Sequence, residues 1–149
     1  MVTKIHNIQF EQTVLCSLMT VQGAYEIVSG SISERSFYAE RHKFIFQVIK
    51  KLIDQGKPCT EGFVDGCLSN DLDGYKSMGG EEYLMQIMSD AMHDFYNIEF
   101  YVSELNRLAD HRDVALISKH MFDLANDTSK VDVFSEAESL LVKSDSTTR

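Results

Sequence analysis

One triplet in this chain has the composition of a catalytic motif for phosphoryl transfer. His111-Arg112-Asp113 matches the opening of a His-Arg-Asp loop, in which the aspartate acts as a base and a later asparagine binds metal. Ser118 stands where that asparagine should be, and the triplet lies inside a helical apolar pattern. We therefore interpret the triplet as part of a solvent-facing helix surface, not as a catalytic site.

Nucleotide and calcium motifs are missing from the sequence. Neither GxxxxGKS/T nor GxGxxG occurs, so hydrolysis of a nucleotide by this chain alone is not expected. Residues 71–74, Asp-Leu-Asp-Gly, begin like a calcium loop, but the glycine comes too early and the closing glutamate is missing. We expect an ordinary turn there, within a loop over residues 69–74.

Cysteine and histidine are the remaining candidates for a reactive or metal-binding site. Cys59 and Cys67 are too far apart for a zinc knuckle, and no CxxC pair occurs. Cys16 falls in an apolar helical run, which indicates a core position and not half of a Cys/His nucleophile pair. His42 begins the strongest helical pattern and is expected to cap or to pack. The sequence thus predicts no catalytic, cofactor-binding or metal-ligating residue.

Composition and charge favour a protein-binding domain over a nucleic-acid-binding one. The formal net charge is −9, and the 14 lysines and arginines are scattered. Because affinity for nucleic acid depends on basic residues that neutralise phosphates, direct DNA binding is not expected. An odd number of cysteines without a signal peptide suits a reducing cytoplasm. No apolar run approaches the length of a membrane span.

Apolar residues recur at helical spacing along the chain, and no segment alternates with a period of two. The pattern predicts an all-α fold. Helices are expected over residues 8–20, 23–29, 41–55, 97–126 and 132–142, with shorter ones after Ser33, Thr60 and Gly79-Gly80. Gly56 is expected to end the third helix, and Asn97 to cap the long one. We predict a compact helical head over residues 1–96, an antiparallel helical hairpin over residues 97–142, and a polar tail or start of a linker over residues 143–149.

The hairpin carries an apolar stripe of its own, which usually marks self-association or a partner. Some of these side chains must pack inside the hairpin, and the sequence alone does not separate them from those on the surface. The predicted self-association or partner surface consists of Leu116, Met121, Phe122, Leu124, Val133, Phe134, Leu140 and Leu141.

Four segments of the chain are similar to the N-terminal domain of DnaB-type replicative DNA helicases. Residues 7–18 resemble the family's opening, N-x-E-A-E-Q-x-V-L-G-x-L. Residues 36–38 and 42–46 resemble its D-F-Y and H-x-x-I-F segment. Residues 79–84 match G-G-x-x-Y-L, and residues 97–101 match N-I-x-x-Y. The four segments occur in the family's order and spacing.

This resemblance implies a helical head with a hairpin that pairs with other copies and helps to build the collar of a hexameric ring. It also implies docking of primase and, in some systems, of a helicase loader. ATP and Mg²⁺ would bind a C-terminal ATPase domain outside this chain, so the chain itself would not be an enzyme. DNA would be bound only through the full-length helicase.

Several positions depart from the family pattern. Cys16 replaces a glycine, Gln9 replaces a glutamate, and the proline that precedes the N-I-x-x-Y segment is absent. We therefore expect a divergent member, of the kind encoded by a phage or plasmid. The alternative function is a stand-alone adaptor or inhibitor of the same fold that binds primase or helicase. A small nucleic-acid-binding domain is a third hypothesis, which the acidic charge argues against.

Overall fold

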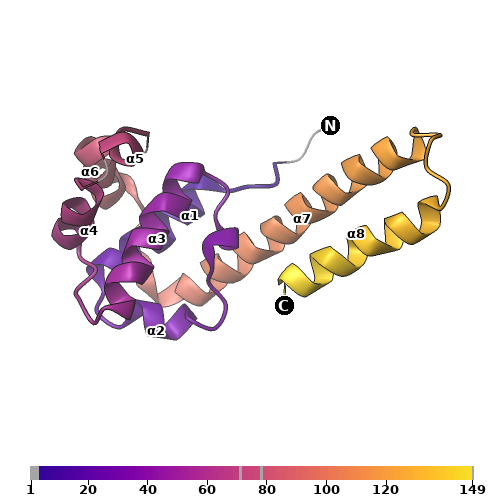
Figure 1. Cartoon of the computed structure of the whole chain (residues 1–149). Helices are drawn as coiled ribbons and strands as arrows, with labels where there is room; N and C mark the ends of the chain where they lie inside the picture. Colours follow the sequence, from indigo (N-terminus) through magenta and orange to yellow (C-terminus); the bar gives the residue numbers. More distant parts are fainter. Residues whose placement is uncertain (1–3, 71, 78, 149) are drawn as a thin grey trace. The chain divides into compact units, whose positions relative to one another are not determined.

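The computed structural model describes residues 4–70, 72–77 and 79–148, and all regular secondary structure in those ranges is helical (Figure 1). The predicted all-α fold is confirmed. The chain divides into two compact units, unit 1 (Met1–Ala109) and unit 2 (Asp110–Arg149). The elements are α1 (Ile8–Thr20), α2 (Ala24–Val28), η1 (Glu34–Ser36), α3 (Glu40–Asp54), α4 (Glu61–Leu68), α5 (Leu72–Ser77), α6 (Gly80–Asp90), η2 (Phe95–Asn97), α7 (Ile98–Ala125) and α8 (Val133–Thr148).

Helices α1 and α3 pack against each other at the centre of unit 1. Asn7 caps α1, because its side-chain oxygen accepts a hydrogen bond from the N–H of Phe10 at 3.0 Å. Helix α1 is buried over most of its length, whereas α3 buries one face and exposes the other. Gly56 follows α3 with a φ of 70°, as expected for a glycine that ends a helix. The large apolar side chains that these two helices bury include Val14, Leu15, Leu18, Ile45, Phe46, Ile49 and Leu52.

Helices α4, α5 and α6 pack on one another, and α4 and α6 connect this group to α3 and α1. The predicted loop over residues 69–74 is wrong in its second half, because α5 begins at Leu72; Asp71 lies outside the described residues. Tyr75 explains the difference. Its ring packs against the core and its hydroxyl donates a hydrogen bond to the Asp65 carboxylate of α4, so tertiary contacts stabilise a helix for which the local sequence gives no clear signal.

The first three turns of α7 belong to the core of unit 1. Ile98, Val102 and Leu105 are almost fully buried there, so the compact unit extends to Ala109 and does not stop at residue 96. Asn97, the expected cap of the long helix, ends η2 instead, and its side-chain amide donates to Asp94 at 2.9 Å. The Asn97 side chain therefore binds the Asp94 carboxylate, in place of the backbone cap that the sequence predicted.

Unit 2 contains the C-terminal part of α7, a turn, and α8, which runs back in the opposite direction (Figure 1). Asp132 caps α8 by accepting a hydrogen bond from the N–H of Ser135 at 3.2 Å. The helix continues to Thr148, beyond the predicted end at residue 142. No proline or glycine interrupts residues 133–148, so nothing in the sequence forces the helix to stop. Arg149, the last residue of the predicted tail, lies outside the described residues.

Gly79 is a glycine whose replacement should disturb unit 1. Its φ is +100°, and a Cβ atom there would lie 2.8 Å from the Cβ atom of Tyr83. We expect Gly79→Ala to lower the free energy of unfolding by about 1–3 kcal/mol, because alanine disfavours this backbone region and the clash is with the Cβ atom of a buried tyrosine. Urea denaturation measures the change.

Gly66→Ala is the matched control for that substitution. Gly66 lies inside α4, and a Cβ atom there meets no atom within 4 Å. This variant should be more stable than the wild type by about 0.5–1 kcal/mol, since alanine is the better helix former. Equal effects of the two substitutions would contradict the assignment of strain to Gly79.

Candidate functional site

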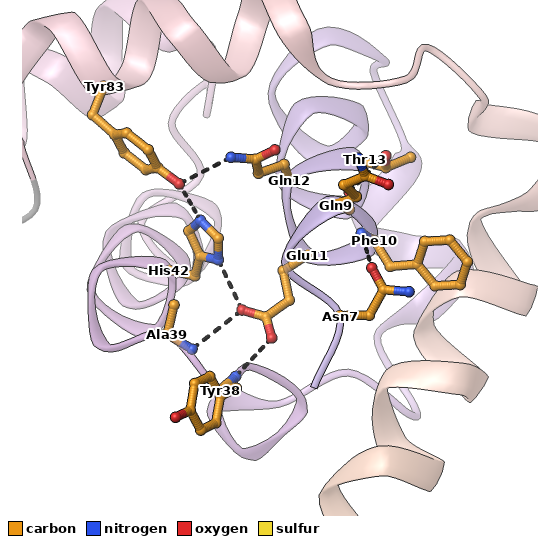
Figure 2. Close-up of polar contacts among 10 residues, drawn as sticks. All are labelled: Asn7, Gln9, Phe10, Glu11, Gln12, Thr13, Tyr38, Ala39, His42 and Tyr83. Carbon is orange, nitrogen blue, oxygen red and sulfur yellow. Dashed lines mark hydrogen bonds and ion pairs between the residues drawn. The ribbon is translucent and has the colours of Figure 1, made fainter. Parts of the chain in front are cut away.

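A buried carboxylate organises the polar interior of unit 1 (Figure 2). Glu11 of α1 is fully buried, and its two oxygens accept three hydrogen bonds. The donors are the N–H of Tyr38 at 2.9 Å, the N–H of Ala39 at 3.3 Å and Nδ1 of His42 at 2.8 Å. Ala39 is the N-cap position of α3 and offers no side-chain cap. A carboxylate on α1 therefore satisfies the start of α3 and lies at the positive end of its dipole.

His42 extends the network from α3 to α6. Its Nε2 lies 2.5 Å from the hydroxyl of Tyr83, which also accepts a hydrogen bond from Nε2 of Gln12 at 3.2 Å. A neutral imidazole with its proton on Nδ1 satisfies every partner. It donates to Glu11 and accepts from Tyr83, while the Tyr83 oxygen accepts from Gln12. The guanidinium of Arg41 lies 3.9 Å above the Tyr83 ring and covers its outer face.

This network is closed to any substrate. Glu11 and His42 are both fully buried, and among the described side chains no buried nitrogen or oxygen lacks a hydrogen-bond partner. His42 packs as the sequence suggested, but it does not cap α3. The network therefore joins three helices instead of performing chemistry. The sequence signal for it was that Glu11 is the only charged residue of the helical stretch 8–20, and neither Glu11 nor Tyr83 was predicted to be part of a site.

The structure brings together one thiol and one imidazole that are 77 residues apart. Sγ of Cys16 lies 3.8 Å from Nδ1 of His93. Cys16 is buried, and that burial raises the pKa of its thiol. A thiol with a raised pKa remains protonated near neutral pH and is a poor nucleophile. Cys16 is therefore a core residue, in agreement with its sequence-based interpretation, whereas His93 is exposed.

Cysteine alkylation checks this conclusion. In the native protein near pH 7.5, we expect iodoacetamide to leave Cys16 unmodified during a reaction time that modifies all three thiols in urea. Cys59 and Cys67 are half-buried and should react before Cys16. Mass spectrometry of tryptic peptides locates the modified residues. Rapid modification of Cys16 in the folded protein would contradict a buried, protonated thiol.

The apolar side chains of unit 2 fall into two groups. The inner group is half-buried and recurs at helical spacing on one face of each helix, so these faces are the ones that α7 and α8 turn toward each other. The outer group is largely exposed. The inner group is Ile117, Met121, Leu124, Val133, Ala137 and Leu140. The outer group is Val114, Leu116, Phe122, Val131, Phe134, Leu141 and Val142.

The predicted interaction surface is divided between these groups. Met121, Leu124, Val133 and Leu140 belong to the inner group and build the hairpin. The other half of the prediction, Leu116, Phe122, Phe134 and Leu141, belongs to the outer group and remains available to another protein. Phe122 is 70% exposed and Phe134 is 85% exposed, which is unusual for phenylalanine in a folded domain.

The described part of the chain shows neither a metal-binding cluster nor a membrane-spanning helix. Among those residues, no group of three histidine, cysteine, aspartate or glutamate side chains is arranged to hold a metal ion. None of the described helices has the length and apolarity needed to cross a membrane. His111, Arg112 and Asp113 lie on α7, as the interpretation of that triplet as a helix surface requires.

The fold and its contents thus define an all-helical domain with a closed polar interior and a helical hairpin that bears exposed apolar residues. The family model for the DnaB-like helicase N-terminal domain matches residues 3–107 of the chain. The chain belongs to this family. The fold is similar to that in the crystal structure of the N-terminal domain of DnaB helicase from Mycobacterium tuberculosis. That likeness has a TM-score of 0.85 and 20% sequence identity, over 94% of this chain and 99% of the other. No curated protein matches the chain by sequence.

Proposed function

We propose that this chain is the assembly and partner-docking domain of an ATP-dependent replicative DNA helicase. Membership of the DnaB-like helicase N-terminal domain family supports the helicase part of the proposal. The observation that carries the assembly part is the outer group of unit 2, in which two phenylalanines are largely exposed beside further aliphatic side chains. Burying such a surface between copies of the chain gains hydrophobic free energy.

The chemistry of unwinding would then belong to another part of the helicase. ATP and Mg²⁺ would bind a C-terminal ATPase domain, and DNA would be bound by the full-length protein in the cytoplasm. Primase and a helicase loader are the proposed docking partners. The acidic charge of this chain supports a role in which it binds proteins and not the phosphate backbone.

Light scattering of the isolated chain over a range of concentrations tests the assembly role. We expect the mass to rise above that of the 17.0 kDa monomer as concentration increases. A monomer mass at every concentration would contradict the proposal that unit 2 is sufficient for self-association.

Reading the natural coding region beyond codon 149 tests the helicase role. A downstream GxxxxGKS/T motif supports it, whereas a stop codon would favour the stand-alone adaptor.

A further inference from the structure

Two aromatic side chains of unit 1 are exposed where α7 begins. Tyr96, in η2, is 96% exposed, and Phe100, in the first turn of α7, is 59% exposed. The two residues are four positions apart in a continuous helical run, so their side chains are neighbours on its surface. A single exposed aromatic residue is ordinary, but an adjacent pair is a typical anchor for a binding partner.

The backbone beneath this pair is held in place by polar contacts. The hydroxyl of Tyr101 donates to the Asp94 carboxylate at 2.6 Å, and the side-chain amide of Asn97 donates to the same group at 2.9 Å. The Phe100 ring contacts the edge of Phe10 of α1, with 6.3 Å between centroids. Because these contacts exist before any partner arrives, little conformational entropy would be lost when the pair is covered.

The stretch of sequence that contains the pair, residues 77–106, carries acidic residues and no lysine or arginine. Arg107, which follows this stretch, is paired with Glu104 at 2.6 Å. Hydrogen bonds from Tyr101 and Asn97 lower the pKa of Asp94, so its carboxylate stays ionised. The acidic residues in this stretch are Glu81, Glu82, Asp90, Asp94, Glu99 and Glu104. Exposed rings and carboxylates both attract cations, the rings through their negative faces.

We infer that the Tyr96–Phe100 surface docks a basic, amphipathic segment of a partner protein. Lysine or arginine side chains of the segment would lie over the two rings and beside Glu99, and its apolar side chains would cover the ring edges. A second copy of this chain fits poorly, because it would place one acidic surface on another. Nucleic acid fits poorly for the same reason. The inference rests on the docking role proposed above and assigns that role to residues other than the outer group of unit 2.

Fluorescence anisotropy with a labelled peptide tests this inference. The probe is an amphipathic peptide of leucine and lysine of about 18 residues, or about five helical turns. We expect Tyr96→Ala and Phe100→Ala each to raise its Kd about tenfold, as for anchor residues. Glu99→Lys should also weaken binding, and added salt should weaken it in the wild type. Circular dichroism confirms that each variant is folded.

Phe63→Ala is the matched control, since Phe63 is an exposed phenylalanine elsewhere in unit 1, on α4. It should bind the peptide as the wild type does. Absence of binding, or equal affinity of all variants, would overturn the inference, the latter because any acidic protein attracts such a peptide. Equal binding of a peptide with glutamate in place of lysine would also overturn it.

Light scattering of the same variants separates this inference from the proposed assembly role. We expect Tyr96→Ala and Phe100→Ala to keep the mass of the wild type. A lower mass would show that this face pairs copies of the chain, which would overturn the inference while supporting self-association. A monomeric wild type that still binds the lysine peptide through Tyr96 would contradict the assembly role alone.

Discussion

Replacing Glu11 with alanine is expected to lower the free energy of unfolding by about 3–5 kcal/mol, because one carboxylate satisfies three buried donors. Removing it leaves two backbone N–H groups and the imidazole of His42 without their partner in the interior. Urea denaturation followed by circular dichroism measures this change. The total stability of a domain is only about 5–15 kcal/mol, so the variant should be partly unfolded at moderate temperature.

Glu40→Ala provides the control for that substitution. Glu40 begins α3, its side chain is exposed, and its contact with Lys43 at 3.4 Å lies in solvent. Its removal should change stability by less than about 1 kcal/mol, as is usual for surface ion pairs. If Glu11→Ala had an effect as small as that of Glu40→Ala, the carboxylate would not be holding α1, α3 and α6 together.

Changing both Phe122 and Phe134 to aspartate is expected to abolish self-association of the chain. Each substitution removes an exposed aromatic anchor and places a charge where a second copy would have to bury it. A loss of about 1.4 kcal/mol at each position weakens a complex tenfold, so the double variant should associate at least about a hundredfold more weakly. Light scattering measures the difference from the wild type.

The hairpin itself should survive this double substitution. Both side chains point away from the inner group, and surface substitutions of this kind usually change stability by less than about 0.5 kcal/mol. Phe134 lies in the first turn of α8, where a negative charge favours the helix. Leu124 is the poorer choice, since a charge in the inner group would disrupt the hairpin. Phe63→Asp, in unit 1, should associate as the wild type does. An unchanged mass of the double variant would exclude this surface.

The sequence by itself determined the helical class of this protein and most of its helix positions. Apolar spacing located α1, α3 and α7 to within a residue or two at each end, because one buried face repeats every three to four residues. Glycines marked the end of α3 and the start of α6. Short family-like segments indicated the DnaB-like helicase N-terminal domain, which the family model then confirmed. Each of these signals depends on residues that are close together in the sequence, so each can be recognised without the tertiary structure.

Tertiary structure alone decided which residues meet. Glu11, His42 and Tyr83 are far apart in sequence, and only the packing of α1, α3 and α6 places them within hydrogen-bond distance. Helix α5 exists because Tyr75 reaches Asp65 and the core, a contact that no local pattern encodes. In unit 2, periodicity predicted a hairpin with apolar residues, but it did not separate the inner group from the outer group. Which side chains turn inward depends on the rotation of α7 and α8 about their own axes, and only the packing of one helix against the other fixes that rotation.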